Sequence, residues 1–303
     1  MAKTFEVTIL GVNSAIPVFE RHPSCQIVNY DEVLYMVDCG EAAQIQISKY
    51  SIRKSKIRHI FISHLHGDHC FGLPGLLTSY ALSGRRKRLD VHGPVGLKRF
   101  LDHIFDVSYT QFPFELVITE YDTEVENVIV VSTSLKVSTF PLKHRVPTMG
   151  FRFEELKDLN IKPETIKEFE LSVDEIKAVK KGDSINRGGK EISNEELTFP
   201  ISNLRAYSYC SDTVYDRDLI PFVKDSTLMY HETTYLDDMK HLARERMHST
   251  LSEAIEIAKS AEVDRLVIGH YSSRYRDISV FLNKGKPLFE NLLLGEEGRV
   301  YQV

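Results

Sequence analysis

The chain is predicted to fold as a layered α/β protein, in which helices pack on β-sheets. Two observations support this class: short apolar segments with a strand pattern dominate the first part of the chain, and strands alternate with helical patterns in the last part. Several of the expected strands also run directly into histidine or aspartate. With 303 residues, the chain is long enough to bury a sizeable core.

The individual elements follow from hydrophobic periodicity. Phe5, Val7 and Ile9 alternate with polar residues, as in a strand with one buried face. Thr250 and Glu253 have the spacing of a capping box, which marks the start of a helix. Helices are expected at residues 42–50, 97–105 and 250–261. Strands are expected at residues 5–10, 26–30, 33–37, 57–63, 128–131, 135–140, 206–210, 226–230 and 265–268.

Residues 154–199 differ in composition from the rest of the chain. They are rich in Glu, Lys and Asp and poor in aromatic residues. We expect one or two short helices in this segment, packed lightly if at all on the core. The predicted organisation is a single domain spanning residues 1–303, with an arm-like insertion at about 154–199.

The composition excludes several classes of protein. No segment approaches the roughly 18 consecutive apolar residues of a membrane span, and the N-terminus lacks the features of a secretory signal. The four cysteines form no CxxC pair, so neither a disulfide framework nor a thiolate zinc site is expected. The formal net charge of −5 does not by itself indicate nucleic-acid binding. We therefore expect a cytoplasmic protein without a membrane partner.

The strongest chemical signal is a run of four potential metal ligands, His64-Leu65-His66-Gly67-Asp68-His69. Burying several imidazoles together is costly unless something binds their lone pairs. The spacing does not match two histidines one helical turn apart, so the ligands must project from a tight loop, for which Gly67 is suited. The sequence therefore predicts a metal site directly after the strand at 57–63.

Three isolated residues are candidates to complete this site. Zinc prefers about four N, O or S ligands, so one short motif cannot fill two metal shells. His144, Asp212 and His270 each follow an expected strand and are flanked by residues that favour turns. We expect these side chains to converge on the motif, although manganese or iron could also occupy a shell of N and O ligands.

The run His64–His69 resembles the signature of the metallo-β-lactamase superfamily. The resemblance implies an αβ/βα four-layer sandwich with the metals at one edge of the two sheets. Other segments resemble the ribonuclease Z family, and the resemblance covers most of the chain outside 154–199. These segments are Val37-Asp38-Cys39-Gly40-Glu41, His231-Glu232-Thr233-Thr234, His248-Ser249-Thr250 and Gly269-His270-Tyr271-Ser272-Ser273-Arg274-Tyr275.

The resemblance also implies two zinc ions per subunit. Such a pair of ions can activate a water molecule at neutral pH and clamp a phosphate oxygen. The implied ligands are His64, His66 and His144 for one zinc, Asp68, His69 and His270 for the other, and Asp212 as the bridge.

His248 is the candidate general acid, because the leaving oxygen needs a proton that zinc does not supply. Glu232 could hold its ring and keep it protonated, against the positive end of the helix that follows. Asp68 could orient or deprotonate the attacking water. For His231, a structural hydrogen bond is the alternative to a catalytic role.

Two sets of basic residues could contact the substrate. Arg274 is a candidate phosphate clamp, with a salt bridge to a buried carboxylate as the alternative. The basic run Arg85-Arg86-Lys87-Arg88, with Lys98 and Arg99 nearby, could contact an RNA backbone or form a solvated face.

The resemblance implies an endoribonuclease that removes the 3′ trailer from precursor tRNA and acts as a homodimer. The tRNA would keep a 3′-hydroxyl and the trailer a 5′-phosphate. Residues 154–199 lie where many family members carry an arm that grips tRNA, but they lack its Gly-Pro-rich tip. The alternatives are a broader phosphodiesterase, acting on cyclic nucleotides or model diesters, and a non-catalytic RNA-binding relative. The complete ligand set argues against the latter, and a lactonase or thioesterase would not need His248 and Glu232.

Overall fold

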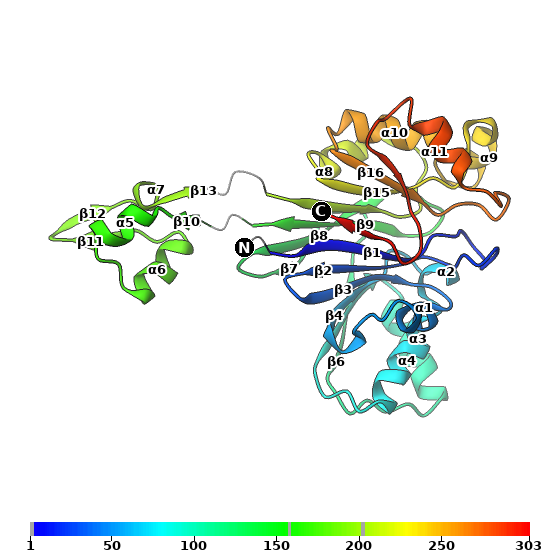
Figure 1. Ribbon diagram of the computed structural model, residues 1–303. Helices are drawn as coiled ribbons and strands as arrows, with labels where there is room; N and C mark the ends of the chain where they lie inside the picture. Colours follow the sequence, from blue (N-terminus) through cyan, green and yellow to red (C-terminus); the bar gives the residue numbers. More distant parts are fainter. Residues whose placement is uncertain (1–2, 157–158, 201–203) are drawn as a thin grey trace.

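The structure is a computed structural model that describes residues 3–156, 159–200 and 204–303, in which two β-sheets pack face to face (Figure 1). The first sheet has the order β18 (Val300–Gln302), β1 (Phe5–Gly11), β2 (Cys25–Tyr30), β3 (Val33–Cys39), β4 (Ile57–Phe61), β5 (Leu89–Pro94) and β6 (Leu116–Tyr121). The second has the order β17 (Leu292–Leu294), β16 (Arg265–Gly269), β15 (Leu228–Glu232), β14 (Ala206–Cys210), β9 (Thr148–Glu155), β8 (Leu135–Leu142) and β7 (Asn127–Val131).

Helices cover the outer face of each sheet, so the molecule has four layers (Figure 1). The first sheet carries α1 (Ala43–Lys49), α2 (Gly67–Cys70), α3 (Leu73–Leu82) and α4 (Leu97–Val107). The second carries α8 (Ile220–Val223), α9 (Lys240–Glu245), α10 (Leu251–Ser260) and α11 (Ser279–Gly285). This arrangement confirms the predicted αβ/βα sandwich.

Strand β3 shows why the sheets must be covered on both faces. Its alternate residues Tyr35 and Val37 belong to the core between the sheets, where the Tyr35 ring lies 5.8 Å from that of Phe153 on the opposite sheet. Leu34 and Met36 point the other way, into the core beneath α1, α3 and α4. Each such side chain contributes roughly 1.5–3 kcal/mol by leaving water, so neither face can be exposed without a large loss of stability.

The expected strands and helices are present, with ends that differ by a few residues. The start of α10 matches its predicted cap, because Glu253 Oε2 accepts a hydrogen bond from the backbone N–H of Thr250 at 3.0 Å. The elements of the sandwich that sequence analysis did not predict include α3, β5, β6 and β9. Helix α3 carries Pro74 and Gly75 in its first turn and is apolar on most sides, which hides its period. Strand β6 is half-buried throughout, so its two faces do not contrast.

Residues 159–200 form a small unit that projects from one end of the sandwich (Figure 1). It contains α5 (Pro163–Glu168), α6 (Val173–Lys180) and α7 (Asn194–Leu197). Strand β10 (Leu159–Ile161) pairs with β13 (Thr198–Pro200), and β11 (Ile185–Arg187) pairs with β12 (Lys190–Ile192). Its buried side chains make a core separate from those of the sandwich: Ile161, Leu171, Val179, Ile185, Ile192 and Leu197.

The structure corrects two details of the prediction for 154–199. The segment holds three described helices rather than one or two, and β9 continues to Glu155 before the projecting unit begins. The prediction gave no positions for these helices, because α5 and α7 are too short to show a hydrophobic period. Residues 157–158 of the predicted insertion lie outside the described residues.

The candidate site lies at one end of the sandwich, where several strands finish. Strands β14, β15 and β16 are parallel, so their carboxyl ends meet at the same edge of the second sheet. Strand β4 of the first sheet ends at this edge too and leads through the histidine motif into α2. The unit of residues 159–200 joins the amino end of β14, and it therefore lies at the opposite end of that strand.

Candidate metal centre

The histidine motif forms a tight turn between β4 and α2. The side chains of His64 and His69 are fully buried, and His66 is partly buried. At the start of α2, Gly67 lies under the ring of Phe71, and a Cβ there would lie 2.7 Å from two of its ring carbons. The turn therefore presents its histidines to one small volume, as the spacing predicts.

A first group of ligand atoms joins this turn to the β8–β9 connection. Nδ1 of His66 lies 3.0 Å from Nε2 of His64 and 3.4 Å from Nε2 of His144. Oδ2 of Asp212, in the loop after β14, lies 3.7 Å from Nε2 of both His64 and His144. These four residues form one candidate metal-binding group.

A second group lies beside the first. Oδ2 of Asp68 lies 3.6 Å from Nε2 of His69 and 3.5 Å from Nε2 of His270. The other oxygen of Asp212, Oδ1, lies 3.1 Å from Nε2 of His270 and 3.4 Å from Nε2 of His69. Asp212 thus faces the two groups with different oxygens, which is the arrangement that a bridging carboxylate requires.

The donor atoms fit bound cations. Asp212 Oδ1 is buried and has no hydrogen-bond partner among the described residues. Burial lowers the pKa of His64 well below its ordinary value, and the neighbouring His69 lowers it further, so its imidazole keeps a free lone pair. Buried imidazoles and carboxylates without other partners are the ligands that divalent transition metals prefer. The residues present therefore fit metal ions.

Three of the histidines are oriented by a contact at the other ring nitrogen. When Nδ1 is held by an acceptor, Nε2 is left to bind a metal, and such outer partners also raise the basicity of the ligand. The three contacts are His69 Nδ1 to Asp38 Oδ2 (2.7 Å), His144 Nδ1 to the Met247 carbonyl (2.8 Å) and His270 Nδ1 to Thr234 Oγ1 (2.9 Å).

Asp38, at the end of β3, connects three strands beneath the centre. Besides His69, its carboxylate accepts hydrogen bonds from Ser63 N (2.8 Å), Ser63 Oγ (2.9 Å) and Tyr209 Oη (2.6 Å). Both Asp38 and His270 have left-handed backbones, with φ of 55° and 59°. Such conformations cost on the order of 1–3 kcal/mol and persist at functional sites because the surrounding contacts enforce them.

Glu232 and His248 form a buried ion pair next to the second group. Nδ1 of His248 lies 2.9 Å from Oε1 of Glu232. Burial opposes the charged imidazole, but the Glu232 carboxylate outweighs it and raises the pKa of His248 above its ordinary value. Glu232 also accepts a hydrogen bond from Thr234 Oγ1 (2.7 Å), the atom that contacts His270. His248 itself lies close enough to Asp212 and His270 to form a third candidate metal-binding group.

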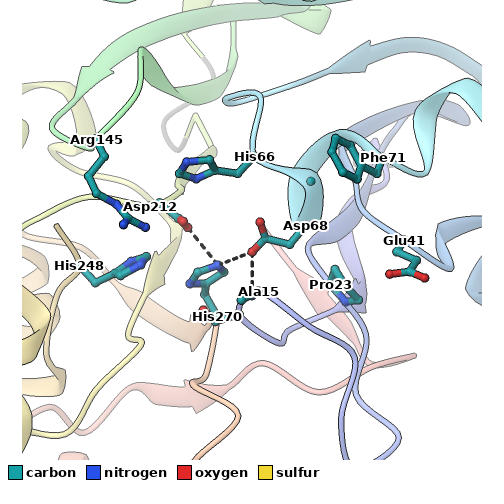
Figure 2. Close-up of a pocket in the computed structure, with 12 residues that line it drawn as sticks. Ala15, Pro23, Glu41, His66, Asp68, Phe71, Arg145, Asp212, His248 and His270 are labelled. Atoms are coloured by element: carbon teal, nitrogen blue, oxygen red, sulfur yellow. Dashed lines mark hydrogen bonds and ion pairs between the residues drawn. The ribbon is translucent and has the colours of Figure 1, made fainter. Parts of the chain in front are cut away.

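The centre opens into a cavity of about 350 Å³ (Figure 2). Arg145 and His248 lie on one side of the clustered ligands, and Phe71, Glu41 and Pro23 lie on the other. Asp68 is fixed between the two sides, because its Oδ2 accepts a hydrogen bond from the backbone N–H of Ala15 at 2.8 Å. One side of the cavity is therefore basic, and the other combines apolar side chains with the carboxylate of Glu41.

The basic residues are placed differently from the sequence prediction. Arg274 is exposed and does not line the cavity, whereas Arg145, which sequence analysis missed, does. Its position directly after His144 was the signal that could have identified it. Arg145 forms no ion pair or hydrogen bond with another described residue, so its guanidinium is available to an anionic ligand.

The other predicted residues have local partners. His231 is buried, and its Nδ1 lies 2.6 Å from the backbone carbonyl of Glu232, which fits the structural alternative. In the basic run, Arg85 donates to the carbonyls of Ile57 and Arg88. Arg88 pairs with Asp90 and Glu115, and Lys98 pairs with Asp102. Much of this run therefore makes local contacts at the surface.

The fold and the clustered ligands define a metal-dependent hydrolase of the metallo-β-lactamase class. The short form of human tRNase Z has a similar structure, with a TM-score of 0.72, 25% identity and coverage of 98% of this chain and 99% of that one. The metallo-β-lactamase fold protein YhfI of Bacillus subtilis shares the fold at a TM-score of 0.69 and 16% identity, over 99% of this chain and all of that one. A family model described as the anti-Pycsar protein Apyc1 matches residues 5–155.

Relatives with higher sequence identity identify the family. The ribonuclease Z of Parabacteroides distasonis is 39% identical over 296 residues, which is 97% of each chain. That of Phocaeicola vulgatus is 40% identical over 295 residues, covering 97% of this chain and 96% of the relative. The chain belongs to the ribonuclease Z family, which confirms the predicted family and the predicted enzyme class, a metal-dependent phosphodiester hydrolase.

Proposed function

We propose that the protein is a zinc-dependent endoribonuclease that cuts precursor tRNA at the 3′ end of the tRNA and releases the trailer. One observation carries this proposal: the scattered ligand candidates converge in two groups, and Asp212 directs one oxygen to each. The family membership supplies the substrate class, since the relatives are named ribonuclease Z.

The two groups are proposed to hold one zinc ion each. When bound, the pair of ions lowers the pKa of a water molecule and offsets the negative charge of the phosphate. Asp68, held by the backbone of Ala15, is placed to orient the attacking water. The proposed ligands of the two ions and of the bridge are His64, His66, His144, Asp68, His69, His270 and Asp212.

His248 is proposed to protonate the leaving oxygen. Hydrolysis breaks the bond between phosphorus and the 3′-oxygen of the tRNA, and that oxygen needs a proton as it departs. Glu232 keeps the imidazole protonated and aims it, because the carboxylate binds Nδ1 and leaves Nε2 as the donor toward the substrate. Arg145 on the same side of the cavity is placed to bind a phosphate, and Arg274 remains a candidate for a contact further out.

We also propose that the protein acts in the cytoplasm as a homodimer, and the direction of the projecting unit at 159–200 supports a substrate shared between the subunits. The unit joins the end of β14 opposite to the metal centre, so it points away from the site of its own chain (Figure 1). A tRNA held by the unit would therefore place its acceptor end in the partner's site. Among the described residues, no helix is long and apolar enough to cross a membrane.

The test is incubation of the purified protein with a 3′-extended precursor tRNA, with and without a chelator. We expect a single chelator-sensitive cut near the acceptor end, with a 5′-phosphate on the released trailer. Cleavage of cyclic nucleotides or unstructured diesters, but not of precursor tRNA, would establish the broader phosphodiesterase instead. Elemental analysis that finds less than one transition metal per chain, with no activity on adding zinc, would refute the metal centre itself.

A further inference from the structure

Phe71 is an exposed aromatic side chain at the mouth of the catalytic cavity. It lines the cavity beside Asp68, yet 64% of its surface is open to solvent. Single exposed apolar side chains are common on protein surfaces, so it is the position of this ring at the cavity, and not its exposure alone, that points to a ligand. No role in metal binding or proton transfer explains the ring, because phenylalanine offers neither a ligand atom nor a proton.

The ring of Phe71 has packing partners on its covered side. It packs so closely over Gly67 that a Cβ at that position would collide with it. On α4, the half-buried ring of Phe100 lies nearly parallel to it, with centroids 6.1 Å apart and an angle of 19° between the planes. These contacts leave one face of the ring open, and an aromatic ring with few rotatable bonds binds a planar partner at a small cost in conformational entropy.

The charge around Phe71 selects a base rather than a phosphate. Glu41 lies on its side of the cavity, and its carboxylate repels the phosphate backbone of a nucleic acid (Figure 2). The cation of the cavity, Arg145, lies on the opposite side with His248. Aromatic side chains bind unpaired bases by stacking, and this contact tolerates any base because every base has a π face.

The position of His248 determines which nucleotide reaches Phe71. The proton donor must lie next to the leaving 3′-oxygen, so the last nucleotide of the tRNA occupies the side of His248 and Arg145. The trailer stays attached to the phosphate through its 5′-oxygen, and its chain continues from there in another direction. The side with Phe71 and Glu41 is the part of the cavity left for it.

We propose that Phe71, supported by Phe100, stacks on the base of the first trailer nucleotide and thereby positions the scissile phosphate. This inference rests on the proposed function. It assigns a role in substrate binding to a residue outside the metal centre, and it gives the RNA one direction across the cavity.

The test compares kcat/KM for three precursor tRNAs: one unmodified, one with an abasic first trailer nucleotide, and one with an abasic last tRNA nucleotide. The variants are Phe71→Ala, Phe71→Leu and Phe71→Tyr, with Tyr109→Ala as a control at a 91% exposed aromatic after α4. On the unmodified RNA, kcat/KM should fall roughly 5- to 150-fold for Phe71→Ala and Phe71→Leu. For Phe71→Tyr, kcat/KM should stay within about threefold of the wild-type value. Tyr109→Ala should have no effect.

The abasic substrates identify the stacking partner. An abasic first trailer nucleotide should lower kcat/KM of the wild-type enzyme by a similar factor. On that RNA, Phe71→Ala should have the same kcat/KM as the wild type. With the abasic tRNA nucleotide, Phe71→Ala should still lose activity. The proposal is overturned if Phe71→Ala lowers kcat/KM equally on all three RNAs. It is also overturned if the variant and the wild type cut the RNA with the abasic tRNA nucleotide equally well. If the wild-type enzyme cuts no precursor tRNA, the proposed function fails, and this inference falls with it. Metal content equal to wild type shows that each variant keeps its site.

Discussion

Glu232 links two parts of the proposed chemistry. Its buried carboxylate contacts His248, the proton donor, and Thr234, which orients the metal ligand His270. Its Oε1 binds His248, and its Oε2 binds Thr234, which in turn contacts His270. A buried carboxylate is stable only when its oxygens accept hydrogen bonds. Glu232 also accepts hydrogen bonds from the backbone N–H groups of Thr213 and Ser249. A change at His248 should therefore affect proton transfer alone, whereas a change at Glu232 acts on proton transfer and on the support of His270.

Replacing His248 by alanine should remove the proton donor and leave the metals in place. We expect kcat for precursor tRNA to fall by roughly 10²- to 10⁴-fold, as is typical for loss of general acid catalysis. The measurement is single-turnover cleavage together with elemental analysis of the variant. Loss of metal from His248→Ala would show that His248 is a ligand, the role that its closeness to Asp212 and His270 makes the main alternative.

Glu232→Gln should shift the pH dependence of cleavage. In the wild type, Glu232 raises the pKa of His248 although burial opposes it, so the protonated acid is present below that raised pKa and is lost as pH rises through it. Without the carboxylate, burial and the nearby Arg145 lower the pKa of the imidazole, and the weaker effect of Asp212 is what still raises it. The alkaline limb of the kcat profile should therefore move to lower pH. An unchanged limb would mean that another group titrates there.

At the scale of elements, the metal centre exists because strand ends from both sheets are tied together beneath it. Asp38 closes β3 and binds the residue before the histidine motif, a histidine of the motif itself, and Tyr209 on β14 of the opposite sheet. The strands alone would bring their ends to one edge, but these hydrogen bonds set the orientation of the ligands.

Asp38→Asn should weaken metal binding without unfolding the sandwich. The amide cannot hold His69 Nδ1 as the carboxylate does, and loss of such a partner typically lowers metal affinity about 10- to 100-fold. Competition with a chromophoric chelator measures the affinity, and circular dichroism checks the fold. Metal affinity equal to wild type would show that the carboxylate does not orient His69. As a matched control, Asp90→Asn at the surface pair with Arg88 should leave affinity unchanged.

At the scale of the whole molecule, the projecting unit and the sandwich are structurally separate. The unit has its own core, and the strands that flank it are already neighbours: Glu155 N donates to the Arg205 carbonyl at 3.0 Å, and the Arg205 guanidinium pairs with the Glu155 carboxylate at 2.7 Å. A short turn could therefore join β9 to β14 directly. The two sheets and the metal centre would keep every contact described above.

Replacing residues 157–203 by a short Gly-Ser turn should leave a folded, metal-binding enzyme that no longer processes tRNA efficiently. We expect metal content and hydrolysis of a small model diester to stay near wild type, because the centre lies at the far end of β14. For precursor tRNA, kcat/KM should fall strongly, mainly because KM rises. The reason is that the contact between the projecting unit and the tRNA, far from the cleaved bond, is lost. Unchanged kcat/KM for precursor tRNA would show that the unit does not bind the substrate.

Local patterns were sufficient to predict most strands, the layered class and the histidine motif. Residues close in sequence determine whether a segment alternates or ends in a turn, so β1, β3 and α10 could be predicted from periodicity and capping alone. Segments without contrast between faces, such as α3 and β6, carry no such signal. The family resemblance added the ligand assignment and the substrate class, which periodicity does not contain.

Only the tertiary structure decided which side chains share the site. The lining by Arg145 and Phe71, the exposure of Arg274 and the hydrogen bond from His69 to Asp38 all join segments far apart in the chain or depend on how a loop is packed. The sequence by itself determined the kinds of ligand and the strands that carry them, because these are local properties. The direction of each side chain follows from the packing of two sheets against each other, which is a sum of long-range contacts.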